Sequence, residues 1–196
     1  MAASKAPIIV GPFRSEIGFE TLYWLPWLAA WRERYQIDAQ RLIVISRGGA
    51  GAWYPALQSA DLYDYAPVAS VRRAMLADAQ RTGSVKQYSL TRQERTLIPV
   101  IAAELGLTRY HVLHPSEMYR ALTPWFNGHA GLADVVEQLR FEPISTPHPP
   151  MDLALPEKFV AVGFYARHTW PMDDDRKEWV MALVEGIAKV CPVVLL

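Results

Sequence analysis

Short apolar runs alternate with segments of helical periodicity along most of the chain. The apolar runs predict strands at residues 7–13, 41–46, 86–90, 111–114, 158–165 and 192–196, with a short pairing piece near 62–65. Runs rich in β-branched residues, such as the first two, are typical of strands that are buried on both faces. Strands that alternate with helices predict a parallel sheet. The predicted fold class is therefore α/β, a Rossmann-like parallel sheet with helices on both faces.

Helical periodicity predicts helices at residues 17–35, 68–80, 92–105, 116–122 and 176–190. Pro26 lies inside the first of these and should kink the helix or mark its true start. Thr91 and Glu94 have the spacing of a capping box, and Ser116 is a candidate cap for the helix that follows it.

Three tryptophans of the first predicted helix recur at three- and four-residue steps: Trp24, Trp27 and Trp31. This spacing places them on one helix face, which predicts a position in the core or at a domain interface. It is not evidence for stacking on carbohydrate.

The alternation is interrupted at residues 141–156, which hold five prolines in 16 residues. Proline-rich segments are stiff and extended, as is typical of an interdomain linker. The sequence therefore predicts an N-terminal Rossmann-like domain at 1–140, a linker at 141–156, and the first βαβ of a second Rossmann-like domain at 157–196. Because the chain ends in an apolar run, we expect the second domain to be truncated.

Composition and charge narrow the classes of function. Apolar residues make up 51% of the 196 residues, which is enough to bury a core and excludes a disordered chain. Basic and acidic residues both number 20, so the charge balance argues against a general nucleic-acid binder. A single cysteine indicates a reducing compartment. No signal peptide and no apolar stretch of about 20 residues is recognisable, so we expect a soluble, cytoplasmic protein.

Candidate chemistry follows the first predicted strand, because ligands of open parallel sheets bind beyond the carboxyl ends of the strands. Arg14, Glu16 and Gly18 lie there, at the start of a helix. Arg14 is a candidate anion contact. Glu16 is either a general base or a helix cap. Neither the G-x-G-x-x-G fingerprint nor a P-loop is present in the chain, which argues against a nicotinamide-dependent dehydrogenase.

Two further loops carry candidates by the same reasoning. Ser46, Arg47 and Gly48 follow the second strand, where glycines permit close backbone approach to a ligand or simply form a tight turn. His114 follows the fourth strand and is either a substrate contact or a packed, hydrogen-bonded residue. The five histidines are far apart in sequence, so no metal site is predicted.

The fifth predicted strand is followed by Arg167 and His168. An arginine at this position is placed to bind a diphosphate, although it could instead pair with the acidic residues 173–175. Those three carboxylates predict helix capping rather than metal binding, because consecutive side chains point in different directions. Asp175 and Glu178 have the capping spacing.

Four segments together resemble a known family: GPFRSEIGFETLYWLPWL, LIVISRGGAGAWY, HVLHPSEMYR and KFVAVGFYARHTWP. They resemble bacterial proteins similar to GT-B glycosyltransferases, which occur in polysaccharide and cell-surface sugar biosynthesis. The GT-B plan has two Rossmann-like domains, of which the first mostly receives the acceptor and the second mostly binds the nucleotide sugar.

The resemblance implies transfer of a sugar from a nucleotide sugar to a hydroxyl acceptor such as a glycan. Arg14, Gly18, Ser46, Arg47, Gly48 and His114 would line the acceptor side, Glu16 would be the base, and Arg167 and His168 would face the donor diphosphate. No cofactor or metal is implied, since the nucleotide sugar is a co-substrate.

The residues that usually bind the nucleotide in such enzymes lie later in the second domain. The resemblance therefore implies that this fragment by itself is inactive. A non-catalytic module of the same fold, binding a glycan or a protein partner, is the alternative. Oligomeric state and peripheral association with a membrane are left open by the sequence.

Overall fold

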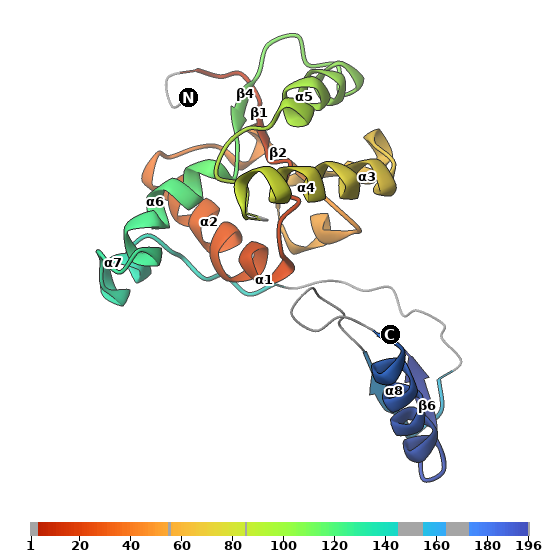
Figure 1. Cartoon of the computed structure of the whole chain (residues 1–196). Coiled ribbons are helices and arrows are strands. Elements are labelled where there is room, and N and C mark those ends of the chain that lie inside the picture. Colours follow the sequence, from red (N-terminus) through yellow and green to blue (C-terminus); the bar gives the residue numbers. More distant parts are fainter. Residues whose placement is uncertain (1–3, 55, 85, 145–154, 164–172, 196) are drawn as a thin grey trace. The chain divides into compact units, whose positions relative to one another are not determined.

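The structure is a computed structural model that describes residues 4–54, 56–84, 86–144, 155–163 and 173–195. It comprises two compact units, Met1–Pro147 and His148–Leu196. The first unit contains a parallel sheet of four strands in the order β3-β2-β1-β4 (Figure 1). These strands are β1 (Ile8–Val10), β2 (Leu42–Ser46), β3 (Gln58–Asp61) and β4 (His111–Leu113).

Both faces of this sheet are buried, as the β-branched runs predict. Successive side chains of a strand point to opposite faces. Accordingly, Ile8 and Val10 join one core cluster, whereas Ile9 joins the other, and all three are fully buried. The α/β fold with helices on both faces is therefore confirmed.

Two groups of helices cover the two faces of the sheet (Figure 1). One face packs against the continuous helical segment α1 (Ile17–Phe19), η1 (Glu20–Trp24) and α2 (Leu25–Arg34), together with α6 (Ser116–Phe126) and α7 (Leu132–Val136). The other face packs against α3 (Leu62–Tyr65), α4 (Val68–Thr82) and α5 (Arg92–Glu104). Short 3₁₀ turns, η2 (Ala39–Arg41) and η3 (Ala50–Trp53), flank β2.

Pro26 does not mark the start of the whole helical segment, as the sequence allows, but it does stand at the start of α2 within that segment. The chain is helical from Ile17 onward, and a π-helical stretch, η1, precedes Pro26. Pro26 then lies in the first turn of α2, where its missing N–H costs little.

The aromatic stripe of this helix lies against the core, as its spacing predicts. Trp24 and Trp27 are buried and stack with ring centroids 5.5 Å apart, and Trp27 is followed by Trp31 at 6.4 Å and Trp31 by Tyr35 at 5.6 Å.

Two predicted strands are wrong. Residues 86–90 form no strand, because the side chain of Gln87 is buried and hydrogen-bonds the loop after β1 instead of extending a ladder. The pairing piece predicted near 62–65 lies earlier, at β3. Asp61 caps α3 by accepting a hydrogen bond from the Tyr63 N–H, so the chain turns into a helix at Leu62.

The predicted caps have mixed outcomes. The capping box of Thr91 and Glu94 is present in full. Ser116 is not a cap, because the N-cap is Pro115 and the Ser116 hydroxyl contacts His114. Helix α8 (Asp174–Ala188) begins before the predicted residue 176, and its cap is Asp173 rather than Asp175, accepting from the Arg176 N–H.

The second unit contains β5 (Val160–Val162), α8 and β6 (Val193–Leu195). The two strands pair in parallel, with Val160 opposite Val193. This is the strand–helix–strand order expected from the sequence. The truncation of a larger second domain stays a prediction.

Candidate functional site

The loops that follow β1, β2 and β4 meet at the carboxyl edge of the sheet, because all three strands are parallel neighbours. Arg47, after β2, donates hydrogen bonds to the backbone carbonyls of Phe13 and Ser15 in the loop after β1. His114, after β4, and Arg14, after β1, both contact Glu94 of α5. Candidates predicted from three separate segments therefore lie side by side.

Arg14 is buried instead of facing solvent, with 4% of its surface exposed. Its Nε donates to Glu94 Oε1 at 2.8 Å, and its Nη2 donates to Asp78 Oδ2 at 2.9 Å and to Thr91 Oγ1 at 3.2 Å. Two carboxylates thus neutralise the guanidinium inside the protein. Nη1 is buried and has no hydrogen-bond partner among the described residues.

Glu94 is the centre of this buried network. Its Oε1 accepts from Arg14 Nε and from Gln87 Nε2, both at 2.8 Å. Its Oε2 accepts from the Thr91 N–H at 2.7 Å and from the Thr91 hydroxyl at 2.8 Å. Burial alone would raise the pKa of Glu94, but hydrogen bonding to His114 and the charge of Arg14 outweigh it and hold the pKa well below its usual range. Glu94 is therefore a fixed anion.

His114 is a positioned member of the same network. Its Nδ1 accepts a hydrogen bond from the Ser116 N–H at 3.1 Å, so in the neutral ring the proton lies on Nε2. Nε2 is 3.2 Å from Glu94 Oε1 and is oriented to donate to it. His114 is buried, and both ring nitrogens have protein partners. This is the packed, hydrogen-bonded role that the sequence leaves open.

A second buried carboxylate, Glu20, organises the loop after β2. Glu20 Oε1 accepts from the Ser46 hydroxyl at 2.5 Å and from the Tyr54 hydroxyl at 2.6 Å. Arg47 Nη1 lies 3.4 Å from Glu20 Oε2. Burial raises the pKa of Glu20, although the bonds to Ser46 and Tyr54 and the charge of Arg47 lower it in part. Ser46 and Arg47 are thus held by the protein itself.

Neither Glu20 nor Glu94 was predicted as a site residue, although a signal for both exists in the sequence. Glu20 continues the stripe of Trp24, Trp27 and Trp31, and Glu94 occupies the same stripe as Ile98 and Ile101 on α5. A carboxylate in a core-facing position at helical spacing must be paired, because an unpaired buried charge is very costly.

Glu16 differs from these carboxylates because it reaches the surface. Its side chain is 33% exposed, and its Oε2 lies 2.6 Å from Lys86 Nζ. The same ammonium lies 3.1 Å from the centre of the Phe19 ring, which gives a cation–π contact. Glu16 is the N-cap residue of α1, but its side chain makes no capping hydrogen bond. The carboxylate is therefore held by a lysine, and the structure disfavours the cap interpretation.

The space around Glu16 contains further side chains suited to a ligand. Tyr88 is half exposed, and its ring lies 5.1 Å from that of Tyr119. The Tyr119 hydroxyl donates to Ser15 Oγ at 3.1 Å, and burial raises the pKa of Tyr119. An exposed aromatic ring thus flanks the Glu16–Lys86 pair.

The glycine candidates have distinct roles. Gly48 and Gly49 have φ of +59° and +79°, and the Gly49 N–H donates to Asp61 Oδ2 at 2.7 Å, so the segment after β2 forms a left-handed turn that favours glycine. Gly18 lies in α1, and a Cβ there would meet no atom within 4 Å. Its surface is therefore open to a ligand or to solvent.

Arg167 and His168 lie outside the described residues, so their contact with a donor diphosphate stays a prediction. Within the part of the chain that the structure describes, no three potential metal-ligating side chains gather. Among the same residues, no helix has the length and apolar character required to span a bilayer.

Comparison of the chain with protein families, with curated proteins and with solved structures finds no match. The class that the fold and the site define is therefore an α/β protein with a parallel sheet and a polar cluster at the carboxyl edge of that sheet.

Proposed function

We propose that this chain supplies the acceptor-side domain of a glycosyltransferase-like enzyme, which transfers a sugar from a nucleotide sugar to a hydroxyl acceptor. The single observation that carries the proposal is the Glu16–Lys86 pair. Glu20 and Glu94 are fully enclosed, whereas Glu16 offers a half-buried carboxylate at the carboxyl edge, where parallel α/β sheets bind ligands.

In the proposed reaction the acceptor hydroxyl loses its proton to a Glu16 carboxylate oxygen. The acceptor oxygen then forms a bond to the anomeric carbon of the donor sugar. The bond from that carbon to the donor phosphate breaks, and the nucleoside diphosphate leaves with the electron pair. Lys86, whose Nζ lies 2.6 Å from Glu16 Oε2, would hold the carboxylate in position. Arg47 acts as a positioning residue, since its guanidinium binds the loop that carries Glu16.

The test compares Glu16→Gln with the matched control Glu104→Gln in the full-length protein. Glu104 is an exposed carboxylate at the end of α5. Release of nucleoside diphosphate is measured with UDP-, GDP- and dTDP-sugars in the presence of glycan acceptors. Loss of a general base costs about 10²- to 10⁴-fold in rate, so Glu16→Gln should fall by at least 10²-fold and Glu104→Gln should not change. Transfer that survives in Glu16→Gln would contradict the assignment.

A second candidate is a non-catalytic binding module of the same fold. The observation that favours it is that Arg14 and Arg47, the predicted substrate cations, form most of their hydrogen bonds within the protein. If the full-length protein binds glycans but none of the nucleotide sugars by calorimetry, this second function is the correct one.

A further inference from the structure

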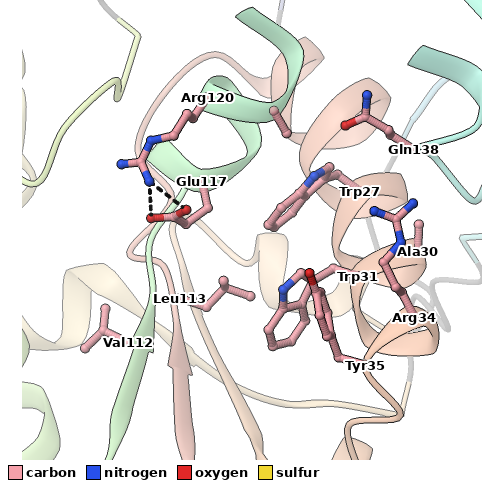
Figure 2. Close-up of a pocket in the computed structure, with 11 residues that line it drawn as sticks. Trp27, Ala30, Trp31, Arg34, Tyr35, Val112, Leu113, Glu117, Arg120 and Gln138 are labelled. Atoms are coloured by element: carbon pink, nitrogen blue, oxygen red, sulfur yellow. Dashed lines mark hydrogen bonds and ion pairs between the residues drawn. The ribbon is translucent and has the colours of Figure 1, made fainter. Parts of the chain in front are cut away.

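A groove between α2 and α6 lies apart from the carboxyl-edge cluster and shares no residue with it. It has a volume of about 390 Å³, within the range of small-molecule sites. Figure 2 shows its walls: Trp27, Trp31 and Tyr35 come from the α2 side, Glu117 and Arg120 come from α6, and Val112 and Leu113 of β4 lie between them.

The α2 wall presents aromatic surface. Trp31 is partly buried, and Tyr35 is 50% exposed. Their ring centroids lie 5.6 Å apart with an interplanar angle of 53°. This pair continues the stack that begins at the buried Trp24, so Trp31 is held against the core and Tyr35 lies at the exposed end of the stack. A rigid aromatic surface binds an apolar ring face at low entropic cost.

The opposite wall is polar. Glu117 pairs with Arg120 through Nη1 at 3.1 and 3.3 Å, and Figure 2 shows this pair on the α6 side, across from Trp27 and Trp31. On the α2 side of the groove, Gln138 adds an amide to the lining (Figure 2). These side chains, which are exposed or partly exposed, keep donors and acceptors that face water, and an apolar ligand would remove that water without replacing its hydrogen bonds, at a cost. A hydroxyl can donate and accept at once, and a polyhydroxylated ligand therefore suits this wall.

Arg34 adds a cation at the rim of the groove. It is exposed, and its side chain has no ion pair or hydrogen bond among residues that the structure describes. Because Glu117 compensates Arg120, the lining carries one net positive charge from Arg34. Guanidinium groups bind carboxylates with two parallel hydrogen bonds.

We propose that this groove binds an oligosaccharide that carries carboxylate groups, with a sugar ring packed on Trp31 and Tyr35 and an acidic group at Arg34. The aromatic rings can pack against the C–H face of the sugar. The Glu117–Arg120 pair and Gln138 can hydrogen-bond its hydroxyls. The guanidinium of Arg34 can pair with its carboxylate. The site is independent of the proposed transferase reaction, because it shares no residue with Glu16 and its neighbours.

The experiment measures binding to the whole chain by isothermal titration calorimetry. The probes are tetragalacturonate and its fully methyl-esterified form, which has the same backbone without charge. Trp31→Ala should weaken the binding of both probes about tenfold, as expected for the loss of an aromatic stacking partner. Trp179→Ala, at an exposed tryptophan of α8, is the matched control and should change neither.

A second pair of variants tests the contribution of the Arg34 charge to ligand binding. Arg34→Gln should weaken tetragalacturonate about two- to fivefold, the range of an exposed ion pair, and leave the esterified probe unchanged. Arg72→Gln, at an exposed arginine of α4, is its control. Equal affinity for both probes would refute the acidic ligand. Binding of neither probe, or dimerisation of the chain that Trp31→Ala abolishes, would overturn the proposal, since the groove would then hold a second copy.

These outcomes are separable from those for the proposed function. Glu16→Gln should leave tetragalacturonate binding unchanged, and Trp31→Ala should leave transfer to a short acceptor unchanged. Failure of one proposal therefore does not imply failure of the other.

Discussion

Replacing Glu94 by glutamine should remove the charge on which the carboxyl-edge loops depend. In the structure, Glu94 accepts hydrogen bonds from Arg14, Gln87, His114 and twice from Thr91. A glutamine has one acceptor oxygen in place of two. Its NH2 group, which can only donate, must therefore face at least one of these donors. Arg14 would retain Asp78, which is 26% exposed, as its remaining carboxylate.

The magnitude follows from burial. The side chains of Arg14 and Glu94 are 5% and 1% exposed, so solvent screens the pair little. Removing one partner of a buried ion pair costs about 3–5 kcal/mol, a large part of the roughly 5–15 kcal/mol that stabilises an ordinary domain. We therefore expect Glu94→Gln to lower the free energy of unfolding by about 3–5 kcal/mol.

The assay is urea unfolding followed by tryptophan fluorescence, because five of the seven tryptophans lie in the unit Met1–Pro147. Glu104→Gln is the control and should stay within about 0.5 kcal/mol of wild type. The double variant Arg14→Met, Glu94→Gln should be less destabilised than the sum of the two single changes, since it leaves no unpaired guanidinium. A cost below about 1 kcal/mol for Glu94→Gln would refute the reasoning.

The pH dependence gives a second measurement on the same variant. The pKa of Glu94 is lower in the folded state than its ordinary value of 4.5. The folded state therefore favours the carboxylate, and this stability is present above pH 4.5 and is lost as the pH falls towards the folded pKa. The difference between wild type and Glu94→Gln should accordingly shrink in acid, and a constant difference would contradict the assigned pKa shift.

Two other changes test the second buried carboxylate and the loop after β1. Glu20→Gln should cost about 1–2 kcal/mol, less than Glu94→Gln, because burial raises the pKa of Glu20, one amide oxygen can accept from both Ser46 and Tyr54, and Arg47, which loses its carboxylate partner, keeps its backbone carbonyl acceptors; a cost equal to that of Glu94→Gln in the same urea assay would count against it. Gly11→Ala should destabilise by about 3 kcal/mol or more, since Gly11 has φ of +118° and a Cβ there would lie 2.4 Å from the Ile45 carbonyl oxygen. Its control, Gly18→Ala, meets no atom within 4 Å and should change stability by no more than about 1 kcal/mol in either direction.

Much of the fold is predictable from local patterns. The run at residues 41–46 is a fully buried strand, and the capping box at Thr91 forms as its spacing predicts. The segment at residues 86–90 has an apolar pattern too weak to separate strand from loop. There, the Gln87 side chain bonds to Pro12, Arg14 and Ser15 and decides the outcome.

The candidate site is predictable in place but not in detail. Parallel strands bring their carboxyl ends to one edge, so the loops after β1, β2 and β4 were expected to meet, and they do. Which charged side chains would be buried, paired or exposed was not predictable. Arg14 is neutralised in the interior, Glu16 is paired at the surface, and Glu20 and Glu94 are enclosed.

The sequence by itself determined the alternation of strands and helices, the parallel sheet and the edge of that sheet where polar loops gather. These features depend on residues within a few positions of one another and on general rules of chain connection. Only the tertiary structure decided which charges are available to a ligand. Arg14 meets Asp78 and Glu94 across 64 and 80 positions of the chain, and pairing at that separation is set by packing rather than by local sequence.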